Sequence, residues 1–241
     1  MGSKSRIAKD IVPIIQDYID EAGVENYCEP FCGGCNIIDK IRCTRKLACD
    51  LNQYLIALLI HVRDGGELYD SVSRELYNKA KAAFKSGHTS EFRSWQIGNI
   101  GFLASFNGKF FDGGYAKAGY EKTRYRDYYR EAKDNLLKQA PKLKGIDFMV
   151  SDYKNINLSG SKYVIYADPP YCGTTKYANA TEFNYDEFWD KMREWAKDNI
   201  VLVSEENAPG DWRCIWQKDV SRSLSATNKS VSVEKLFIKG D

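Results

Sequence analysis

Two consecutive prolines directly after an apolar run fix the end of one strand in this chain. The run from Tyr163 to Ala167 reads Tyr-Val-Ile-Tyr-Ala, which is typical of a buried strand, and Asp168-Pro169-Pro170-Tyr171 follows it directly. Proline has no backbone N–H to donate to a neighbouring strand, so the strand must end there. The sequence therefore predicts that Asp168 and Tyr171 lie at the carboxyl edge of a sheet, where open α/β sheets bind ligands.

Strand-like segments alternate with helical segments along most of the chain. The helical period is clear in residues 7–19, where apolar residues recur at three- and four-residue spacing. Alternation of this kind predicts an α/β fold, a mostly parallel sheet with helices on both faces. Strands are predicted at 24–29, 46–50, 148–151, 163–167, 200–204 and 233–238, and helices at 7–19, 36–42, 51–62 and 185–197.

The segment 61–145 breaks this alternation, because its pattern is mainly helical, polar and basic. It holds 16 Lys and Arg against 10 Asp and Glu, whereas the whole chain has a net charge of only +2. Aromatic residues are interleaved with these charges, which suits a surface that follows phosphates and stacks on bases. An ordinary solvated helical region would have the same composition. We predict an inserted DNA-binding domain at 61–145, which interrupts a domain made of 1–60 and 146–241.

Cysteine, histidine and hydropathy patterns argue against several other classes of protein. Seven cysteines are an odd number for a secreted disulfide framework, and Cys28, Cys32 and Cys35 lack a second Cys or His pair at zinc-finger spacing. With only two histidines in the chain, Ser/His/Asp and Cys/His catalysis are disfavoured. No apolar run approaches the ~20 residues of a membrane-spanning helix, and the N-terminus lacks the pattern of a signal peptide. We expect a cytoplasmic protein with no metal site and no membrane partner.

The residues that end the 163–167 strand suit methylation of an aromatic amine. The lone pair of an exocyclic ring amine is delocalised, so the amine attacks a methyl sulfonium poorly unless acceptors draw on its two N–H groups. The Asp168 carboxylate and the Pro169 carbonyl can supply these acceptors, and Tyr171 can stack on a base that has swung out of the duplex. The alternative is a proline turn with an aspartate cap.

The order of these motifs resembles that of the Dam-like DNA adenine methyltransferases over nearly the whole chain. In that family the Asp-Pro-Pro-Tyr tetrapeptide is the catalytic motif and S-adenosylmethionine is the methyl donor. The resemblance implies an α/β fold: a Rossmann-like methyltransferase sheet with an inserted, mainly helical DNA-recognition domain. It makes Asp168, Pro169, Pro170 and Tyr171 the predicted catalytic residues.

The resemblance also assigns residues to the methyl donor. Glu29-Pro30-Phe31-Cys32-Gly33-Gly34 is similar to the glycine loop beneath the donor's methionine part, and Lys4 stands where the family contacts the donor's carboxylate end. Asp50, 17 residues beyond Gly33, stands at about the distance where dinucleotide-binding folds place an acid on the ribose hydroxyls. Asp152 matches a contact to the donor's adenine, or caps a turn. The predicted donor-binding residues are Lys4, Pro30, Phe31, Cys32, Gly33, Gly34, Asp50, Asp152 and Asp168.

Within the insertion, Ser105-Phe106-Asn107-Gly108-Lys109 is similar to the DNA-contacting hairpin of the family. Asparagine is suited to bidentate contact with adenine in the major groove. Lys and Arg contact phosphates, which positions the protein on DNA without specifying a base sequence. Each of these cations can equally be a plain surface charge. The predicted DNA-binding residues are Phe106, Asn107, Lys109, Lys117, Arg124 and Arg126.

Together these assignments predict a site-specific, adenine-specific DNA methyltransferase of the restriction-modification type that acts on a flipped-out adenine. Its expected partners are double-stranded DNA and S-adenosylmethionine, and it is expected to work as a monomer in a prokaryotic cell or phage-infected host, without a metal. Three alternatives stay open: methylation of the exocyclic amine of cytosine, methylation of adenine in RNA, and a catalytically idle DNA-binding homologue. Asp168 at the head of the tetrapeptide favours adenine by resemblance.

Overall fold

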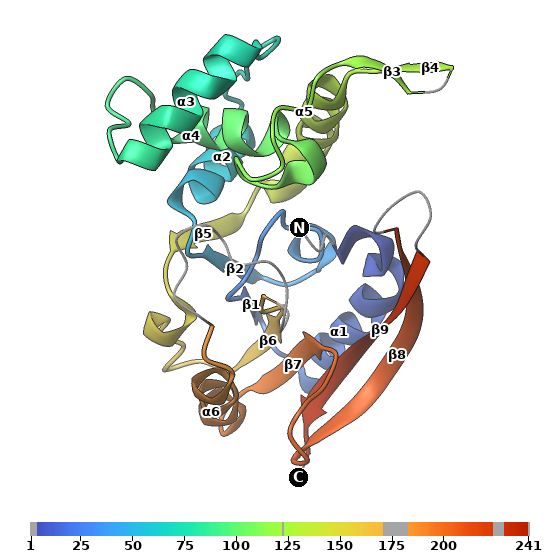
Figure 1. The fold of residues 1–241 in the computed structure, drawn as a ribbon. Helices are drawn as coiled ribbons and strands as arrows, with labels where there is room; N and C mark the ends of the chain where they lie inside the picture. The colour runs from blue at the N-terminus through green and yellow to red at the C-terminus, as the bar shows by residue number, and fades with distance from the viewer. Residues whose placement is uncertain (1–3, 122, 171–182, 224–228, 241) are drawn as a thin grey trace.

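A seven-stranded mixed sheet forms the centre of the molecule (Figure 1). The computed structural model describes residues 4–121, 123–170, 183–223 and 229–240. The strand order is β5-β2-β1-β6-β7-β9-β8. The first five strands are parallel to one another, and β9 pairs antiparallel with both β7 and β8. The mostly parallel sheet expected from the sequence is thus confirmed. The strands are β1 (Asn26–Glu29), β2 (Arg45–Asp50), β5 (Ile146–Val150), β6 (Tyr163–Ala167), β7 (Ile200–Glu205), β8 (Trp212–Ser223) and β9 (Lys229–Lys239).

Alternate side chains of β6 point to opposite faces of the sheet and so divide the core in two. Val164 and Tyr166 pack in the hydrophobic cluster that includes α1 (Ala8–Ala22). Ile165 and Ala167 pack in the cluster that includes α6 (Tyr185–Ala196). Figure 1 shows the two helices on either side of the sheet. Both helices and their placement on the two faces agree with the sequence prediction.

A mainly helical region lies beside the β5 end of the sheet (Figure 1). Buried Tyr77, Ile97 and Phe111 of this region belong to the same hydrophobic cluster as Ile11 of α1 and Val164 of β6. The helical region and the sheet therefore share one core, and the predicted boundary at residue 60 falls inside α2. The elements are α2 (Gln53–Arg63), α3 (Arg74–Ser86), α4 (Ser94–Gly98), a π-helical turn (Asn99–Leu103), the hairpin β3 (Gly119–Glu121) and β4 (Arg124–Arg126), and α5 (Tyr128–Gln139).

Short 3-10 turns complete the fold, and one of them replaces a predicted helix. The helix expected at 36–42 is wrong, because only Ile38–Lys40 forms a single turn. Cys35, before this turn, has a left-handed φ of +56°, and Ile41, after it, is extended. Residues on both sides of the turn are therefore non-helical, and a longer helix does not form. The other 3-10 turns are Lys4–Arg6, Phe106–Gly108, Ala140–Leu143 and Tyr153–Asn155.

The sequence also failed to predict strand β8. Its residues include Arg213, Lys218 and Asp219, and they show no regular alternation of apolar and polar positions. The strand forms because β9 offers a partner along almost its whole length, with one register shift between Cys214 and Trp216. A pairing of this kind depends on a partner from another part of the chain, which a local pattern does not contain.

Candidate active site

The ends of three neighbouring parallel strands bring acidic groups to one edge of the sheet. Strand β1 lies between β2 and β6, and all three run in the same direction. Glu29 is the last residue of β1, Asp50 is the last residue of β2, and Asp168 directly follows β6. The topology therefore brings Asp50, Asp168 and the loop that begins after Glu29 to the same carboxyl edge.

Residues 31–35 form a tight loop over the end of β2. The Cys32 N–H donates to the Cys49 carbonyl at 2.8 Å, and the Cys35 N–H donates to the Cys32 carbonyl at 2.8 Å. Gly33 has a φ of +47°, a conformation that residues with a Cβ rarely adopt. A Cβ placed on Gly33 would meet no atom within 4 Å, so the loop faces open space at this residue.

Asp50 joins this loop to the start of α2. Its Oδ2 accepts the Gly33 N–H at 3.2 Å, and its Oδ1 accepts the Asn52 N–H at 2.8 Å. Asn52 in turn caps α2, because its side chain accepts the N–H groups of Tyr54 and Leu55. Burial raises the pKa of Asp50, and the two backbone N–H groups oppose that rise. Each carboxylate oxygen has a further lone pair with which it can accept a hydrogen bond from a ligand.

Asp168 is held by a buried lysine from the start of the chain. Lys4 is 6% exposed, and its Nζ lies 3.0 Å from Asp168 Oδ1 and 3.0 Å from Glu234 Oε2. Burial raises the pKa of Asp168 to about 6, the Lys4 ammonium opposes that rise, and the Glu234 carboxylate adds to it. The structure places Lys4 between these two carboxylates, and its predicted contact with the methyl donor stays a prediction.

The remaining residues of the predicted tetrapeptide differ in exposure. Pro169 is buried and Pro170 is exposed, and the Pro170 carbonyl accepts a hydrogen bond from the Tyr185 hydroxyl at the start of α6. This contact ties the chain after β6 to the helix that covers the same face. Tyr171, the last predicted catalytic residue, lies outside the described residues.

Phe31 and Asp152 flank the same edge. The Phe31 ring packs against Tyr153, with a centroid separation of 5.1 Å, and against Phe188 of α6 at 5.9 Å. Asp152 Oδ1 accepts the Lys154 N–H at 3.0 Å and so caps the 3-10 turn that carries Tyr153. Pro30, before Phe31, is buried. Asp152 thus has a turn-capping contact, while its predicted contact with the donor stays a prediction.

Two further carboxyl groups at this edge were not singled out from the sequence. Glu29 is 3% exposed and accepts the Tyr27 hydroxyl at 2.8 Å, and burial raises its pKa to about 8. Glu205 is 5% exposed at the end of β7, and burial raises its pKa to about 7. The available signal was an acid at the very end of an apolar strand, because such an acid is carried to the ligand-binding edge of the sheet.

The sequence matches the family model described as D12 class N6 adenine-specific DNA methyltransferase over residues 1–97 and 106–200. This match spans most of the chain, including the glycine loop, Asp50 and Asp168. The chain belongs to this family. The relation expected from the tetrapeptide and the glycine loop is therefore confirmed, and S-adenosylmethionine is the methyl donor of the class.

A curated relative supports the same family. The chain is 23% identical over 209 residues to the type II methyltransferase M.FokI of Planomicrobium okeanokoites, an alignment that covers 80% of this chain and 31% of the relative. The chain thus spans about a third of the length of that relative.

The solved structures that this chain matches are distant from it. A putative RNA methyltransferase from Pyrococcus horikoshii is 9% identical with a TM-score of 0.42, covering 95% of this chain and 82% of the other. A putative methylase from Haemophilus influenzae is 8% identical with a TM-score of 0.36, covering 98% and 89% of the two chains. In the part of this chain that the structure describes, no helix is both long enough and apolar enough to cross a membrane.

The residues at the sheet edge fit the methyl donor of the D12 class. Burial raises the pKa values of Glu29 and Asp168 to about 8 and about 6, so a ligand that brings positive charge would stabilise the ionised carboxylates. A cationic sulfonium bound at this edge would supply such charge, and the hydroxyls of a ribose could donate to Asp50. The open space at Gly33 leaves room for the ligand beside the loop.

The predicted DNA-binding residues lie in two separate places in the helical region. Phe106, Asn107 and Lys109 stand in a loop that Ser105 and Tyr115 close by a single bridge, and Asn107 has a φ of +56°. This is the segment that resembles the DNA-contacting hairpin of the family; its backbone forms a 3-10 turn at Phe106–Gly108, and its contact with DNA stays a prediction.

A two-stranded hairpin is formed by β3 and β4, and β4 carries Arg124 and Arg126. Arg126 is held by the carboxylates of Glu121 and Glu131, and its guanidinium lies over the Tyr128 ring at 4.7 Å. Arg124, like Lys109 and Lys117 of the preceding segment, is exposed. The hairpin projects from the helical region in Figure 1.

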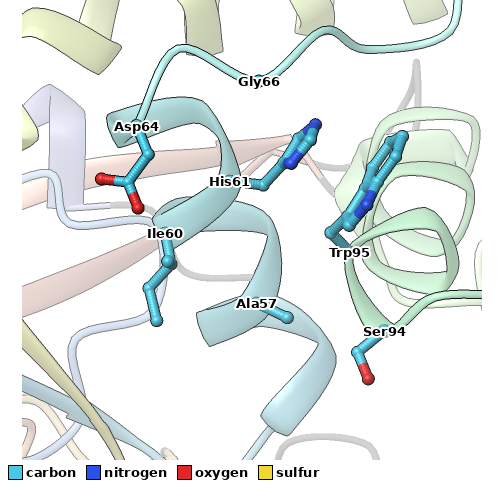
Figure 2. Close-up of a pocket in the computed structure, with 7 residues that line it drawn as sticks. All are labelled: Ala57, Ile60, His61, Asp64, Gly66, Ser94 and Trp95. Atoms are coloured by element: carbon cyan, nitrogen blue, oxygen red, sulfur yellow. The ribbon is translucent and has the colours of Figure 1, made fainter.

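A pocket between α2 and α4 is separate from the sheet edge (Figure 2). The His61 and Trp95 rings stack with a centroid separation of 3.9 Å and an angle of 4° between their planes. His61 Nε2 also lies 2.8 Å from the Glu67 carbonyl oxygen, so the ring joins α4 to the loop after α2. No residue of the predicted site lines this pocket. Its lining consists of Ala57, Ile60, His61, Asp64, Gly66, Ser94 and Trp95.

Proposed function

We propose that this chain transfers a methyl group from S-adenosylmethionine to the exocyclic N6 of a flipped-out adenine at a specific site in duplex DNA. The observation that carries the proposal is the position of Asp168, held 3.0 Å from Lys4 at the end of β6, at the same sheet edge as Asp50 and the glycine loop. Membership of the D12 class supports adenine as the acceptor.

Asp168 and Pro169 orient the amine of the base in this mechanism. The Asp168 carboxylate accepts one N6–H and the Pro169 carbonyl accepts the other, so the lone pair of the nitrogen is drawn out of conjugation with the ring. The ion pair with Lys4 fixes the Asp168 carboxylate, and the Pro170 carbonyl is anchored to Tyr185. The acceptors are thus held in place before the base arrives, which lowers the entropic part of the barrier. Tyr171 is proposed to stack on the base.

Bound S-adenosylmethionine supplies a methyl group whose bond to sulfur breaks, with the electron pair left on sulfur, as its bond to N6 forms. Asp168 then takes the proton that N6 loses and passes it to water. A pKa raised to about 6 suits this task, because the group is mostly ionised at neutral pH and still basic enough to accept a proton. Asp50 is proposed to hold the ribose of the donor, residues 30–34 to lie under its methionine part, and Asp152 to contact its adenine.

We assign DNA recognition to residues 61–145. The support is the excess of 16 Lys and Arg over 10 Asp and Glu in this segment, together with exposed aromatic residues on the hairpin, Tyr120 and Tyr125. The phosphates of DNA attract a basic surface whatever the DNA sequence is. Aromatic side chains that stack on bases assist the extrusion of a base from the duplex. The proposed DNA contacts are Phe106, Asn107, Lys109, Lys117 and Arg124, whereas Arg126, which the sequence also suggested, is proposed to stay paired with Glu121 and Glu131 within the hairpin region.

The proposal is tested by incubating the purified chain with methyl-labelled S-adenosylmethionine and unmethylated duplex DNA, then digesting the DNA to nucleosides. We expect the label in N6-methyldeoxyadenosine. Label in methyldeoxycytidine would keep the chemistry and overturn the acceptor. Label transferred only to RNA of the same sequence, or donor binding without any transfer, would overturn DNA adenine methylation altogether.

A further inference from the structure

Glu205 is a buried carboxyl group with one oxygen that no described residue satisfies. It ends β7, the strand next to β6, and is 5% exposed. Its Oε1 accepts the Glu206 N–H at 2.8 Å, whereas its Oε2 is buried without a hydrogen-bond partner among the residues that the structure describes. Buried polar atoms in folded proteins are nearly always paired, so this oxygen points to a partner that is not part of the described chain.

Glu205 lies at the same edge as the acceptors proposed for the amine. The parallel register pairs Ala167 with Val203, and two further residues along each strand bring Glu205 level with Pro169. Neighbouring strands lie about 4.8 Å apart. Two adjacent atoms on one edge of a base, each making a hydrogen bond of about 2.8 Å, can therefore contact the ends of both strands. A base whose amine is held beside β6 can therefore reach the end of β7 with the ring atom next to that amine.

Burial favours the neutral form of Glu205. Burial raises the pKa of Glu205 to about 7, the carboxylates of Glu206 and Asp168 add to the rise, and the Lys4 ammonium opposes it. On the other side of β7, Lys235 of β9 is its register partner. A neutral carboxyl group is a hydrogen-bond donor as well as an acceptor. Near neutral pH, Glu205 can thus offer an O–H where Asp168 offers only acceptors.

We propose that Glu205 is a base-contacting residue whose carboxyl O–H donates to the ring nitrogen N1 of the target adenine. This assignment rests on the proposed function. In adenine, N1 is an acceptor adjacent to the carbon that bears N6, so a donor beside the two amine acceptors completes recognition of that edge. In guanine the corresponding N1 carries a hydrogen. The Glu205 O–H would then face an N–H, and neither donor would have an acceptor. Glu205 therefore selects a base that has an acceptor beside its amine.

The test compares two substrates and three enzymes. The duplexes carry either adenine or 1-deazaadenine at the target position, the latter having C–H in place of N1. The enzymes are the wild type, Glu205→Gln and Glu205→Leu. Glutamine is the conservative variant, because its side chain has a similar length and ends in a hydrogen-bond donor. Leucine replaces the carboxyl group by an apolar side chain that has no donor. Binding of labelled S-adenosylmethionine by each variant checks that the sheet edge is folded.

On adenine we expect Glu205→Gln to stay within about threefold of wild-type kcat/KM and Glu205→Leu to lose roughly 10- to 100-fold. On 1-deazaadenine the wild type should lose its advantage, so that it and Glu205→Leu act at similar rates. If the effect of the leucine substitution disappears on 1-deazaadenine, Glu205 contacts N1. A merely structural effect of leucine would instead lower the kcat/KM for both substrates equally.

Equal loss on the two substrates, or no loss on adenine, would overturn the assignment of Glu205 while leaving the proposed function intact. Failure of the wild type to methylate adenine would overturn the proposed function, and this assignment with it.

Discussion

The edge of the sheet and the helical region use charge in opposite ways. At the sheet edge, Glu29, Asp168 and Glu205 are largely buried and their pKa values are raised. In the helical region, Arg124 and Lys117 are exposed to solvent. A buried charge is costly unless a partner compensates it, so each group matters strongly to what binds there. An exposed charge interacts weakly and acts only as one member of a larger field.

The largest effect is expected where one buried acceptor is removed from the sheet edge. Asp168→Ala should lower the rate of methyl transfer by roughly 10²- to 10⁴-fold, because the amine loses both an acceptor and the group that takes its proton. Donor binding should change far less, since Asp50 and the glycine loop remain. Single-turnover transfer and an equilibrium titration with labelled donor measure the two separately.

The matched control for this change is Asp147→Ala, which removes an exposed aspartate of β5 outside the site. It should transfer methyl groups at the wild-type rate. An Asp168→Ala enzyme that matched the Asp147→Ala control would show that the acceptor lies elsewhere, and the contrast between the two regions would then not depend on Asp168.

The sheet edge was largely predictable from the sequence because its determinants are local. The prolines at 169 and 170 end β6 wherever it lies in the sheet, and a parallel strand carries the residue at its end to the ligand-binding edge. The positions of Asp168 and Asp50 follow from these two rules. The ion pair from Lys4 to Glu234 does not, because it joins the first turn of the chain to β9, 230 residues apart.

The helical region was predictable in class but not in detail. Its mainly helical character was predicted, whereas the hairpin of β3 and β4 was not. Short strands of three residues have too little sequence to show alternation, and their pairing depends on the turn between them. The shared core that includes Tyr77 and Val164 also requires contacts between distant segments, which periodicity does not contain.

The next effect concerns the donor. Asp50→Ala should weaken binding of S-adenosylmethionine by roughly 10- to 100-fold, because a carboxylate hydrogen bond to the ribose is lost and the loop at Gly33 loses its anchor. Once donor is saturating, transfer should recover much more than in Asp168→Ala. Isothermal calorimetry measures the affinity, and unchanged affinity would mean that Asp50 only supports the loop and the start of α2.

Two changes around Asp168 should shift the pH dependence of transfer in opposite directions. Asp168 acts when ionised, so the rate falls as the pH drops through its pKa of about 6. Lys4 lowers this pKa and Glu234 raises it. Lys4→Met should therefore move the acid limb to higher pH and Glu234→Gln to lower pH, and a shift of about one unit changes the rate by roughly tenfold at a fixed acid pH.

The measurement is the pH profile of single-turnover transfer at saturating donor, between about pH 5 and pH 8, a range that includes the raised pKa of Asp168 but lies above that of an ordinary carboxylate. Saturating donor separates this effect from any direct contact of Lys4 with the donor. Shifts in the same direction for both variants would contradict the charge arrangement and indicate that each change simply loosens the sheet edge.

The smallest effect is expected for single cations of the helical region, and it differs between two arginines of one hairpin. Arg124 is exposed, whereas Arg126 is held by Glu121 and Glu131. Arg124→Ala should weaken DNA binding by roughly two- to tenfold and lower the slope of log affinity against log salt by about 0.9, the value for one phosphate contact. Arg126→Ala should leave that slope unchanged, because a guanidinium neutralised by two carboxylates displaces no counterion from DNA.

Titrations between about 50 and 200 mM salt resolve the difference, since the affinity of a protein that contacts several phosphates changes by orders of magnitude over this range. Equal slopes for the two variants would mean that the ion pairs of Arg126 open when DNA binds, and exposure alone would then not distinguish the cations that face phosphate.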